Sequence, residues 1–114
     1  MGQEFRFVLR TAADIRRALL AGEELALVDV REEALYATGH PLFAVNIPLS
    51  TLETGVYSRI PRRTTPVTVY DNNDGLAATA VQRLQHLGYR DVALLQDGLN
   101  GWREAGEELF IDVN

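Results

Sequence analysis

Two aspartates, Asp71 and Asp74, lie in a short polar loop between a strand-like run and a helical pattern. The loop follows Val67–Tyr70 and precedes a helix that is predicted to begin near Leu76. The first backbone N–H groups of such a helix lack partners inside the helix, so they can hold an anion or orient a nucleophile. A carboxylate placed there can attack a phosphoryl group or a sugar, or it can accept hydrogen bonds from those amides and cap the helix. The loop is therefore the candidate site.

The same loop, from Asp71 to Gly75, is also similar to a cation-binding loop. An EF-hand needs glycine at its sixth position and glutamate at its twelfth, whereas here Gly75 is fifth and Gln82 is twelfth. The spacing excludes an EF-hand and leaves open a weak Mg²⁺ or Ca²⁺ site. An enzyme that uses Asp71 as a base or nucleophile on a metal-bound substrate is one functional hypothesis, although the loop supplies no cationic clamp of its own.

Length and composition limit the other possibilities. The 114 residues predict one domain over 1–114, and an intact small protein and a fragment of a longer chain are equally compatible with the ends. A net charge of −5, from 11 basic and 16 acidic residues, argues against general binding of nucleic acids. The absence of a long apolar run and of a signal-like start predicts a cytoplasmic protein without a membrane span. The chain has no cysteine, which removes thiol nucleophiles, disulfides and cysteine metal ligands together.

Alternating strand-like and helix-like patterns predict an α/β fold that positions the loop. Short runs rich in β-forming residues predict strands at 5–9, 25–30, 44–47, 67–70 and 92–95. Apolar residues at helical spacing predict helices at 12–21, 31–38, 49–57, 76–87 and 99–105. Thr11 with Asp14 predicts a capping box at the start of the first helix. This alternation implies a mainly parallel sheet covered by helices on both faces, in which ligands bind beyond the carboxyl ends of the strands. Asp29, Asp71, and Gln96 or Asp97 fall at such ends.

Several short motifs, spread from about Val8 to Gly106, share their order and spacing with one known family. The motifs are Leu27-Val-Asp-Val-Arg-Glu32, Thr38-Gly-His40, Ala44-Val-Asn-Ile-Pro48, Val67-Thr-Val-Tyr70, Leu84-Gln-His-Leu-Gly-Tyr89, Val92-Ala-Leu-Leu95, Gly98-Leu-Asn-Gly-Trp102 and Ala105-Gly106. With this pattern the chain resembles the rhodanese (sulfurtransferase-like) family. The resemblance implies a three-layer α/β fold with a five-stranded, mainly parallel sheet flanked by helices.

The resemblance also identifies the polar loop. In active members the loop begins with a cysteine that accepts a sulfane sulfur from thiosulfate or a similar donor and passes it to cyanide or a thiol. The loop equivalent to it here consists of Asp71, Asn72, Asn73, Asp74, Gly75 and Leu76. Asp71 stands at the cysteine position, and Leu76 and Ala77 stand where arginine and serine are frequent. Because a persulfide needs sulfur, the resemblance implies no catalytic residue for sulfur transfer in this chain.

Charge and two smaller departures also distinguish this loop from active ones. Asp71 and Asp74 would repel an anionic donor, because like charges ~6 Å apart at an effective dielectric of ~20 repel by roughly 3 kcal/mol before salt screening. Pro41-Leu-Phe43 replaces the usual Ile-Pro-Gly, and Asp97 stands where the first of two glycines is usual.

Four further residues are predicted to have framework roles: Asp29, Arg31, His40 and Trp102. Asp29 ends a predicted strand, and Arg31 can pair with it or with one of the two glutamates that follow. His40 is expected to fix a turn by hydrogen bonding, and Trp102 is expected to anchor the core.

The leading hypothesis is a rhodanese-like domain without sulfurtransferase activity. It would act as a structural, binding or regulatory module of a tandem thiosulfate sulfurtransferase, with neighbouring rhodanese domains of the same chain as its partners. The alternatives are the metal-assisted enzyme described above and an interaction module that binds an acidic partner or an anion through Arg59, Arg62 and Arg63. No cofactor and no metal is predicted under the leading hypothesis.

Overall fold

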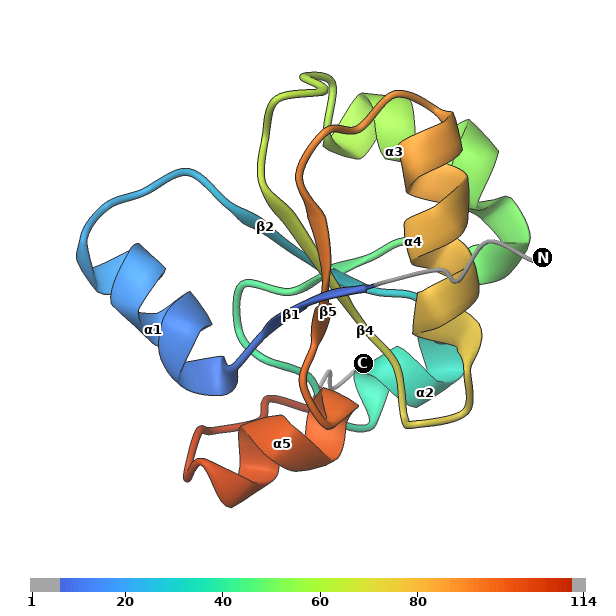
Figure 1. Ribbon diagram of the computed structural model, residues 1–114. Coiled ribbons are helices and arrows are strands. Elements are labelled where there is room, and N and C mark those ends of the chain that lie inside the picture. Colours follow the sequence, from blue (N-terminus) through green and yellow to red (C-terminus); the bar gives the residue numbers. More distant parts are fainter. Residues whose placement is uncertain (1–6, 112–114) are drawn as a thin grey trace, which may run out of the picture.

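Five short strands form one parallel sheet in the order β1-β5-β4-β2-β3 (Figure 1). The structure is a computed structural model that describes residues 7–111. Along the chain the elements are β1 (Val8–Arg10), α1 (Ala12–Leu20), β2 (Ala26–Asp29), α2 (Glu33–Ala37), β3 (Val45–Asn46), a short 3₁₀ helix η1 (Leu49–Thr51), α3 (Leu52–Arg59), β4 (Val67–Tyr70), α4 (Leu76–His86), β5 (Val92–Leu95) and α5 (Gly98–Glu104). The predicted α/β fold with a five-stranded parallel sheet is confirmed.

The sheet separates two hydrophobic cores because successive side chains of a strand point to opposite faces. On one face, Val67 and Val69 of β4 pack against residues of α3 and α4. On the other face, Tyr70 packs with residues of α1 and α5, including Ile15 and Trp102. All four residues of β4 are buried, as expected for a central strand covered on both faces.

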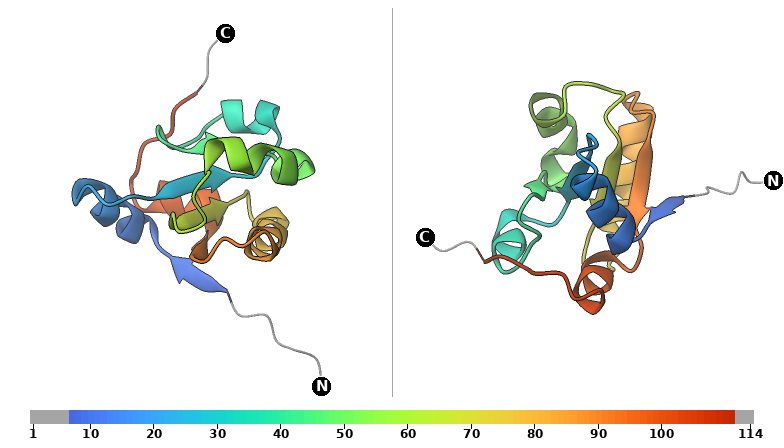
Figure 2. Two further views of the ribbon diagram at one scale, coloured as in Figure 1. Left: turned by 90° about the horizontal axis from the view of Figure 1, so that it is seen from above. Right: turned by 90° about the vertical axis from the view of Figure 1, so that its left-hand side faces the viewer.

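The order of the strands brings β4 to the middle of the sheet and leaves β1 at an edge, paired with β5 alone. Figure 2 shows β1 on the opposite side of the molecule from α2 and α3. Since β4 lies between β5 and β2, the loop that follows Tyr70 faces the turn that follows β5. The topology therefore places residues 71–75 beside residues 96–98.

Most elements lie where the sequence places them, with differences at their ends. The capping box of α1 is confirmed, because the Asp14 N–H donates to Thr11 Oγ1 and the Thr11 N–H donates to Asp14 Oδ2. The helix predicted at 31–38 is shorter, Glu33–Ala37, because Arg31 is held back against the preceding strand. The helical segment predicted at 49–57 extends to Arg59, and of the strand predicted at 5–9 only the part from residue 7 lies within the described residues. No helix within residues 7–111 is long and apolar enough to span a membrane.

Candidate functional site

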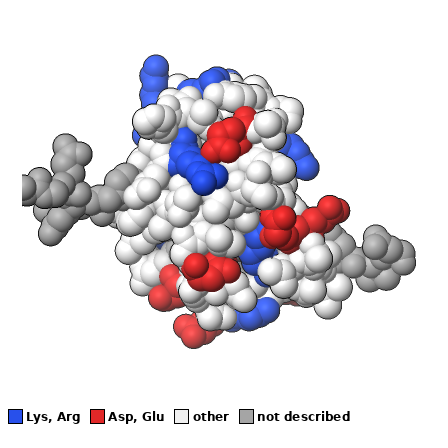
Figure 3. Space-filling view, turned by 90° about the vertical axis from the view of Figure 1, so that its right-hand side faces the viewer, with Lys and Arg blue, Asp and Glu red and all other residues white. Residues whose placement is uncertain are grey.

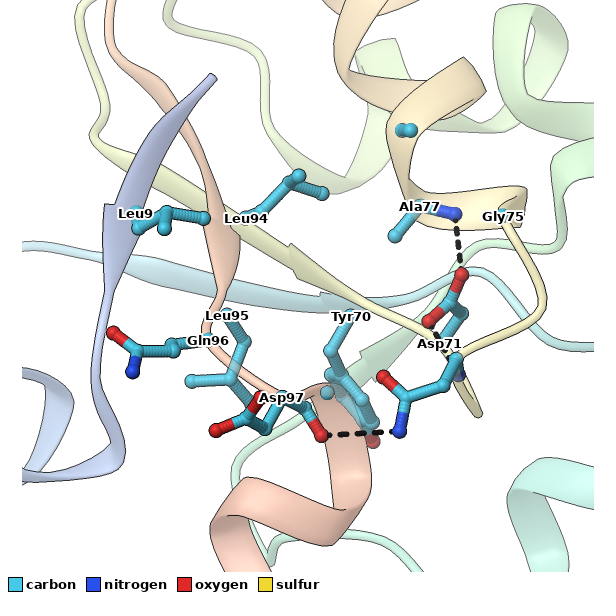
Figure 4. A pocket seen from close by; sticks show the side chains of 12 residues that line it. Leu9, Tyr70, Asp71, Gly75, Ala77, Leu94, Leu95, Gln96 and Asp97 are labelled. Atoms are coloured by element: carbon cyan, nitrogen blue, oxygen red, sulfur yellow. Dashed lines mark hydrogen bonds between the residues drawn. The ribbon is translucent and has the colours of Figure 1, made fainter.

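The side chain of Asp71 turns back into its own loop. It is only 6% exposed, although it follows directly after β4. Its Oδ1 accepts a hydrogen bond from the Asn73 N–H at 2.8 Å, and its Oδ2 accepts one from the Ala77 N–H at 2.9 Å (Figure 4). Ala77 is the second residue of α4, so the carboxylate caps that helix and lies against the positive end of its dipole. Asp71 thus accepts hydrogen bonds from two backbone amides, one in the loop and one in the first turn of α4.

The loop owes its shape to two residues in the left-handed region. Asn73 has φ 63° and Gly75 has φ 86°, conformations that asparagine and glycine tolerate better than other residues. Gly75 is the N-cap of α4 and has no side chain to cap it, which leaves that task to Asp71. The sequence left open whether Asp71 or Asp74 accepts the loop amides. The structure assigns them to Asp71, because Asp74 is exposed and accepts no hydrogen bond from the described residues.

Hydrogen bonds connect the loop at residues 71–75 to the turn that follows β5. The Leu99 N–H donates to the carbonyl oxygen of Asp71 at 3.1 Å, and Asn73 Nδ2 donates to the carbonyl oxygen of Asp97 at 3.3 Å. A Cβ atom on Gly98 would lie 2.9 Å from the Asp71 carbonyl oxygen and 2.9 Å from Asn73 Oδ1. Only glycine fits this approach without displacing the backbone.

A cavity of about 410 Å³ opens beside the loop (Figure 4). Its lining residues come from β1, β4, α4, β5 and both loops: Leu9, Tyr70, Asp71, Asn73, Gly75, Ala77, Ala78, Leu94, Leu95, Gln96, Asp97 and Gly98. The only charged residues among them are Asp71 and Asp97, both acidic. Among residues 7–111, the cavity therefore has no cationic lining group that would attract or clamp an anion.

Asp29 and Arg31 form a buried ion pair outside this cavity. Arg31 Nη2 donates to Asp29 Oδ2 at 2.7 Å and to the Gly39 carbonyl oxygen at 2.7 Å, while Nε lies 3.0 and 3.1 Å from the two carboxylate oxygens. The side chains of Asp29 and Arg31 are 0% and 3% exposed. Of the partners that the sequence left open for Arg31, the structure therefore shows Asp29. Burial, followed by the nearby Asp29 charge, raises the pKa of Tyr70, whose ring centroid lies 5.8 Å from the guanidinium carbon of Arg31.

His40 and Trp102 also lie away from the cavity. His40 is buried, its ring stacks on Tyr36 at a centroid distance of 3.9 Å, and its Nδ1 donates to the Pro41 carbonyl oxygen at 2.8 Å. Trp102 is buried in the core beside α1, and its Nε1 donates to the Glu108 carbonyl oxygen at 3.1 Å. Neither residue, nor Asp29 or Arg31, lines the cavity beside Asp71.

The three arginines of the basic loop have different surroundings. Arg62 pairs with Glu24, and the guanidinium carbon of Arg63 lies 4.4 Å from the ring centroid of Tyr57. Arg59 lines a separate cavity together with two glutamates. Figure 3 shows basic and acidic side chains interspersed on one face of the molecule. The prediction of an interaction surface built on these arginines gains no support from their arrangement.

The metal hypothesis requires a group of ligands near Asp71. Within residues 7–111, no group of three or more His, Cys, Asp or Glu residues is placed to hold a metal ion.

The sequence reasoning missed the parts of the site that depend on contacts between residues far apart in the chain. These are the role of Gly98, the contact of Asn73 with Asp97, and the three leucines that β1 and β5 contribute to the cavity. The Asp97-Gly98 dipeptide is a local signal for a tight turn.

Comparisons with known proteins agree with this geometry. The family model for the rhodanese-like domain matches residues 11–105. A crystal structure of thiosulfate sulfurtransferase from Pseudomonas aeruginosa is 63% identical with a TM-score of 0.91, and the match covers 93% of this chain and 20% of that chain. The Alr3790 protein from Anabaena sp. is 26% identical with a TM-score of 0.84, over 92% of this chain and 83% of that one.

A curated relative is the uncharacterized protein slr1261 from Synechocystis sp., which is 32% identical over 85 residues. The match covers 74% of this chain and 46% of the relative. This chain thus spans less than half of that relative and about a fifth of the Pseudomonas protein.

Proposed function

We propose that this chain, which belongs to the rhodanese-like family of domains, is a module that does not itself carry sulfur. It would serve as a structural, binding or regulatory part of a larger thiosulfate sulfurtransferase. The observation that carries the proposal is the Asp71 carboxylate, which stands at the nucleophile position and accepts hydrogen bonds from Asn73 and Ala77.

The chemistry of the side chain supports this role. Sulfane sulfur is carried on a thiolate, and the chain has no cysteine at any of its 114 positions. The Asp71 carboxylate also fills the place of a bound anion, since it already holds the two loop amides. A donor such as thiosulfate would have to displace the Asp71 carboxylate from these two amides. Because this carboxylate is part of the chain, it cannot dissociate and leave the site.

The electrostatics of the cavity support the same conclusion. Thiosulfate is an anion, and the charged residues lining the cavity are Asp71 and Asp97. No described cation lines the cavity to offset their repulsion, which acts at short range and is only partly screened by salt. Binding of an anionic donor is therefore disfavoured before any chemistry could begin.

The lengths of the relatives support the proposal that this domain is one part of a larger protein. The Pseudomonas protein that bears the name thiosulfate sulfurtransferase is about five times as long as the segment matched here, at 63% identity. We infer that this chain corresponds to one rhodanese-like domain within such a protein, where another domain would provide the cysteine. The cytoplasmic location expected from the sequence stays part of this proposal.

Sulfur transfer from thiosulfate to cyanide, followed as thiocyanate formation, tests the proposal. We expect the purified wild-type chain to show the rate of a heat-denatured sample of the same protein. Thiocyanate formation clearly above that control, proportional to the concentration of folded protein, would overturn the proposal. A sulfurtransferase with a loop cysteine, assayed in parallel, shows that the donor and acceptor are competent.

A further inference from the structure

One strip of the sheet beside α4 is left uncovered by helices. Leu9 of β1 pairs in register with Leu94 of β5, so both side chains point to the same face of the sheet. Leu94 packs partly against the core under α4, whereas Leu9 lies farther out on the edge strand and is 56% exposed. Leu9 and Leu94 therefore form a short apolar strip at the edge of the sheet, next to the cavity.

This strip forms one wall of the cavity beside Asp71, which we name the edge groove. Figure 4 shows Leu9 and Leu94 on one side, with Ala77 of α4 across from them. In the same view Asp71 lies directly below Ala77, and Asp97 lies lower, on the side of Leu9 and Leu94. The edge groove thus has apolar walls and an acidic end, within a volume of about 410 Å³ that is typical of ligand sites.

The two carboxylates differ in availability. The oxygens of Asp71 are fixed by two amides, but each carboxylate oxygen can accept a further hydrogen bond. Asp97 is exposed and forms no ion pair with any residue between 7 and 111. Its backbone lies in the left-handed region, at φ 60°, in the turn that follows β5. The negative charge at the end of the groove therefore has no described counterion.

We propose that the edge groove binds an arginine or lysine side chain presented by a partner polypeptide. The inference rests on the proposed non-catalytic role, because it names the partner chemistry of the same site. Long basic side chains lay their methylene groups along apolar surface and keep the charged head at a polar end. In the edge groove the stem would lie along Leu9 and Leu94, and the cationic head would reach Asp97 and Asp71. An arginine has the advantage of donating in a planar, bidentate manner to a carboxylate.

Amide chemical shifts of the ¹⁵N-labelled full chain test this proposal with two matched probes. The first probe is N-acetyl-L-arginine N-methylamide, and the second is its citrulline counterpart, which has nearly the same shape and no charge. We expect the arginine probe to shift the amides of Ala77, Leu94 and Asp97 with a Kd of about 1–10 mM, a range suited to a single side chain. The citrulline probe should bind at least about fivefold more weakly, because it lacks the charge that the acidic end would attract.

A pair of variants separates local from general electrostatics. Asp97→Asn removes a carboxylate of the edge groove and keeps a residue that tolerates a left-handed backbone, so the arginine probe should lose at least about fivefold in affinity. Glu104→Gln removes an exposed charge on α5 that does not line the groove, so affinity should stay within about twofold. A matching affinity loss in both variants would show nonspecific attraction and overturn the proposal.

Other outcomes would also overturn it. Equal binding of the two probes, shifts confined to other surfaces, or Mg²⁺ alone producing the same shifts at lower concentration would each do so. These readouts report binding only. Sulfur transfer by the wild-type chain would refute the non-catalytic role without changing them, and absent probe binding would leave that role intact.

Discussion

The Asp71 carboxylate accepts a hydrogen bond at 2.9 Å from the backbone N–H of Ala77, which lies at the start of α4. This contact joins the end of the central strand to the first turn of the helix that covers it. A single side chain therefore closes the loop, caps the helix and fills the position of an anion. The consequences for stability and for chemistry can be tested separately.

Removal of the carboxylate should destabilise the fold. Asp71→Ala leaves the buried amide of Ala77 and the partly buried amide of Asn73 without their acceptor, so the free energy of unfolding should fall by about 1–3 kcal/mol. Urea denaturation followed by circular dichroism measures the change. Asp74→Ala is the matched control in the same loop and should change stability by less than about 0.5 kcal/mol. An equal loss in both variants would contradict the capping role of Asp71.

Introduction of a thiol tests whether the loop retains the geometry for sulfur chemistry. We expect the Asp71→Cys thiolate to attack the outer sulfur of thiosulfate slowly, forming a persulfide as the S–S bond of the donor breaks and sulfite leaves. Asp71→Cys combined with Leu76→Arg should react faster, because the arginine offsets the acidic surroundings. Intact-mass spectrometry detects the added sulfur, and Asp71→Ser serves as the control without a thiol. If the double variant takes up no sulfur, the loop amides do not support a persulfide even when the nucleophile is present.

Substitution of Gly98 should be costly for two separable reasons. Gly98→Ala places a Cβ atom 2.9 Å from the Asp71 carbonyl oxygen and adds the strain of φ 53°. Gly106→Ala carries a similar backbone strain at φ 80°, with no atom within 4 Å of its Cβ. We expect Gly106→Ala to lose about 1 kcal/mol and Gly98→Ala at least about 1 kcal/mol more, by thermal or urea unfolding. Similar losses in the two variants would show that the loop of Asp71 and the turn at Gly98 can move apart at little cost in free energy.

The buried ion pair should matter more than a surface pair. Arg31→Met leaves the Asp29 carboxylate uncompensated in the interior and should cost about 3–5 kcal/mol. Arg17→Met removes an exposed pair with Asp14, so its cost should be about 0–1 kcal/mol. Denaturant midpoints of the two variants provide the comparison. A small loss for Arg31→Met would mean that water or a neighbouring group solvates Asp29.

The fold was largely predictable because its signals are local. The run 67–70 is apolar and rich in β-formers, the apolar residues of 76–87 recur at helical spacing, and both elements appear close to their predicted bounds. The predicted helix from 31 was too long because Arg31 makes a tertiary contact with Asp29 that no local propensity reveals.

The site was less predictable because it depends on which strands are neighbours. The sequence singled out Asp71 and Asp74 together, and only the three-dimensional path of the loop decides which carboxylate meets the amide of Ala77. Leu9 and Leu94 share a wall because β1 pairs with β5, an arrangement that the order of elements along the chain does not disclose.

The double hydrogen bond of Asp71 also bears on how this domain can evolve. Aspartate and cysteine codons differ at two nucleotides, so a stepwise path between them passes through glycine or tyrosine. Neither residue can accept hydrogen bonds from the amides of Asn73 and Ala77 as the carboxylate does. Tyrosine would also not fit the buried position without rearrangement. The intermediate would therefore lose stability before any nucleophile appeared. The hydrogen bonds that hold the loop together thus oppose each single-nucleotide step from aspartate toward cysteine at position 71.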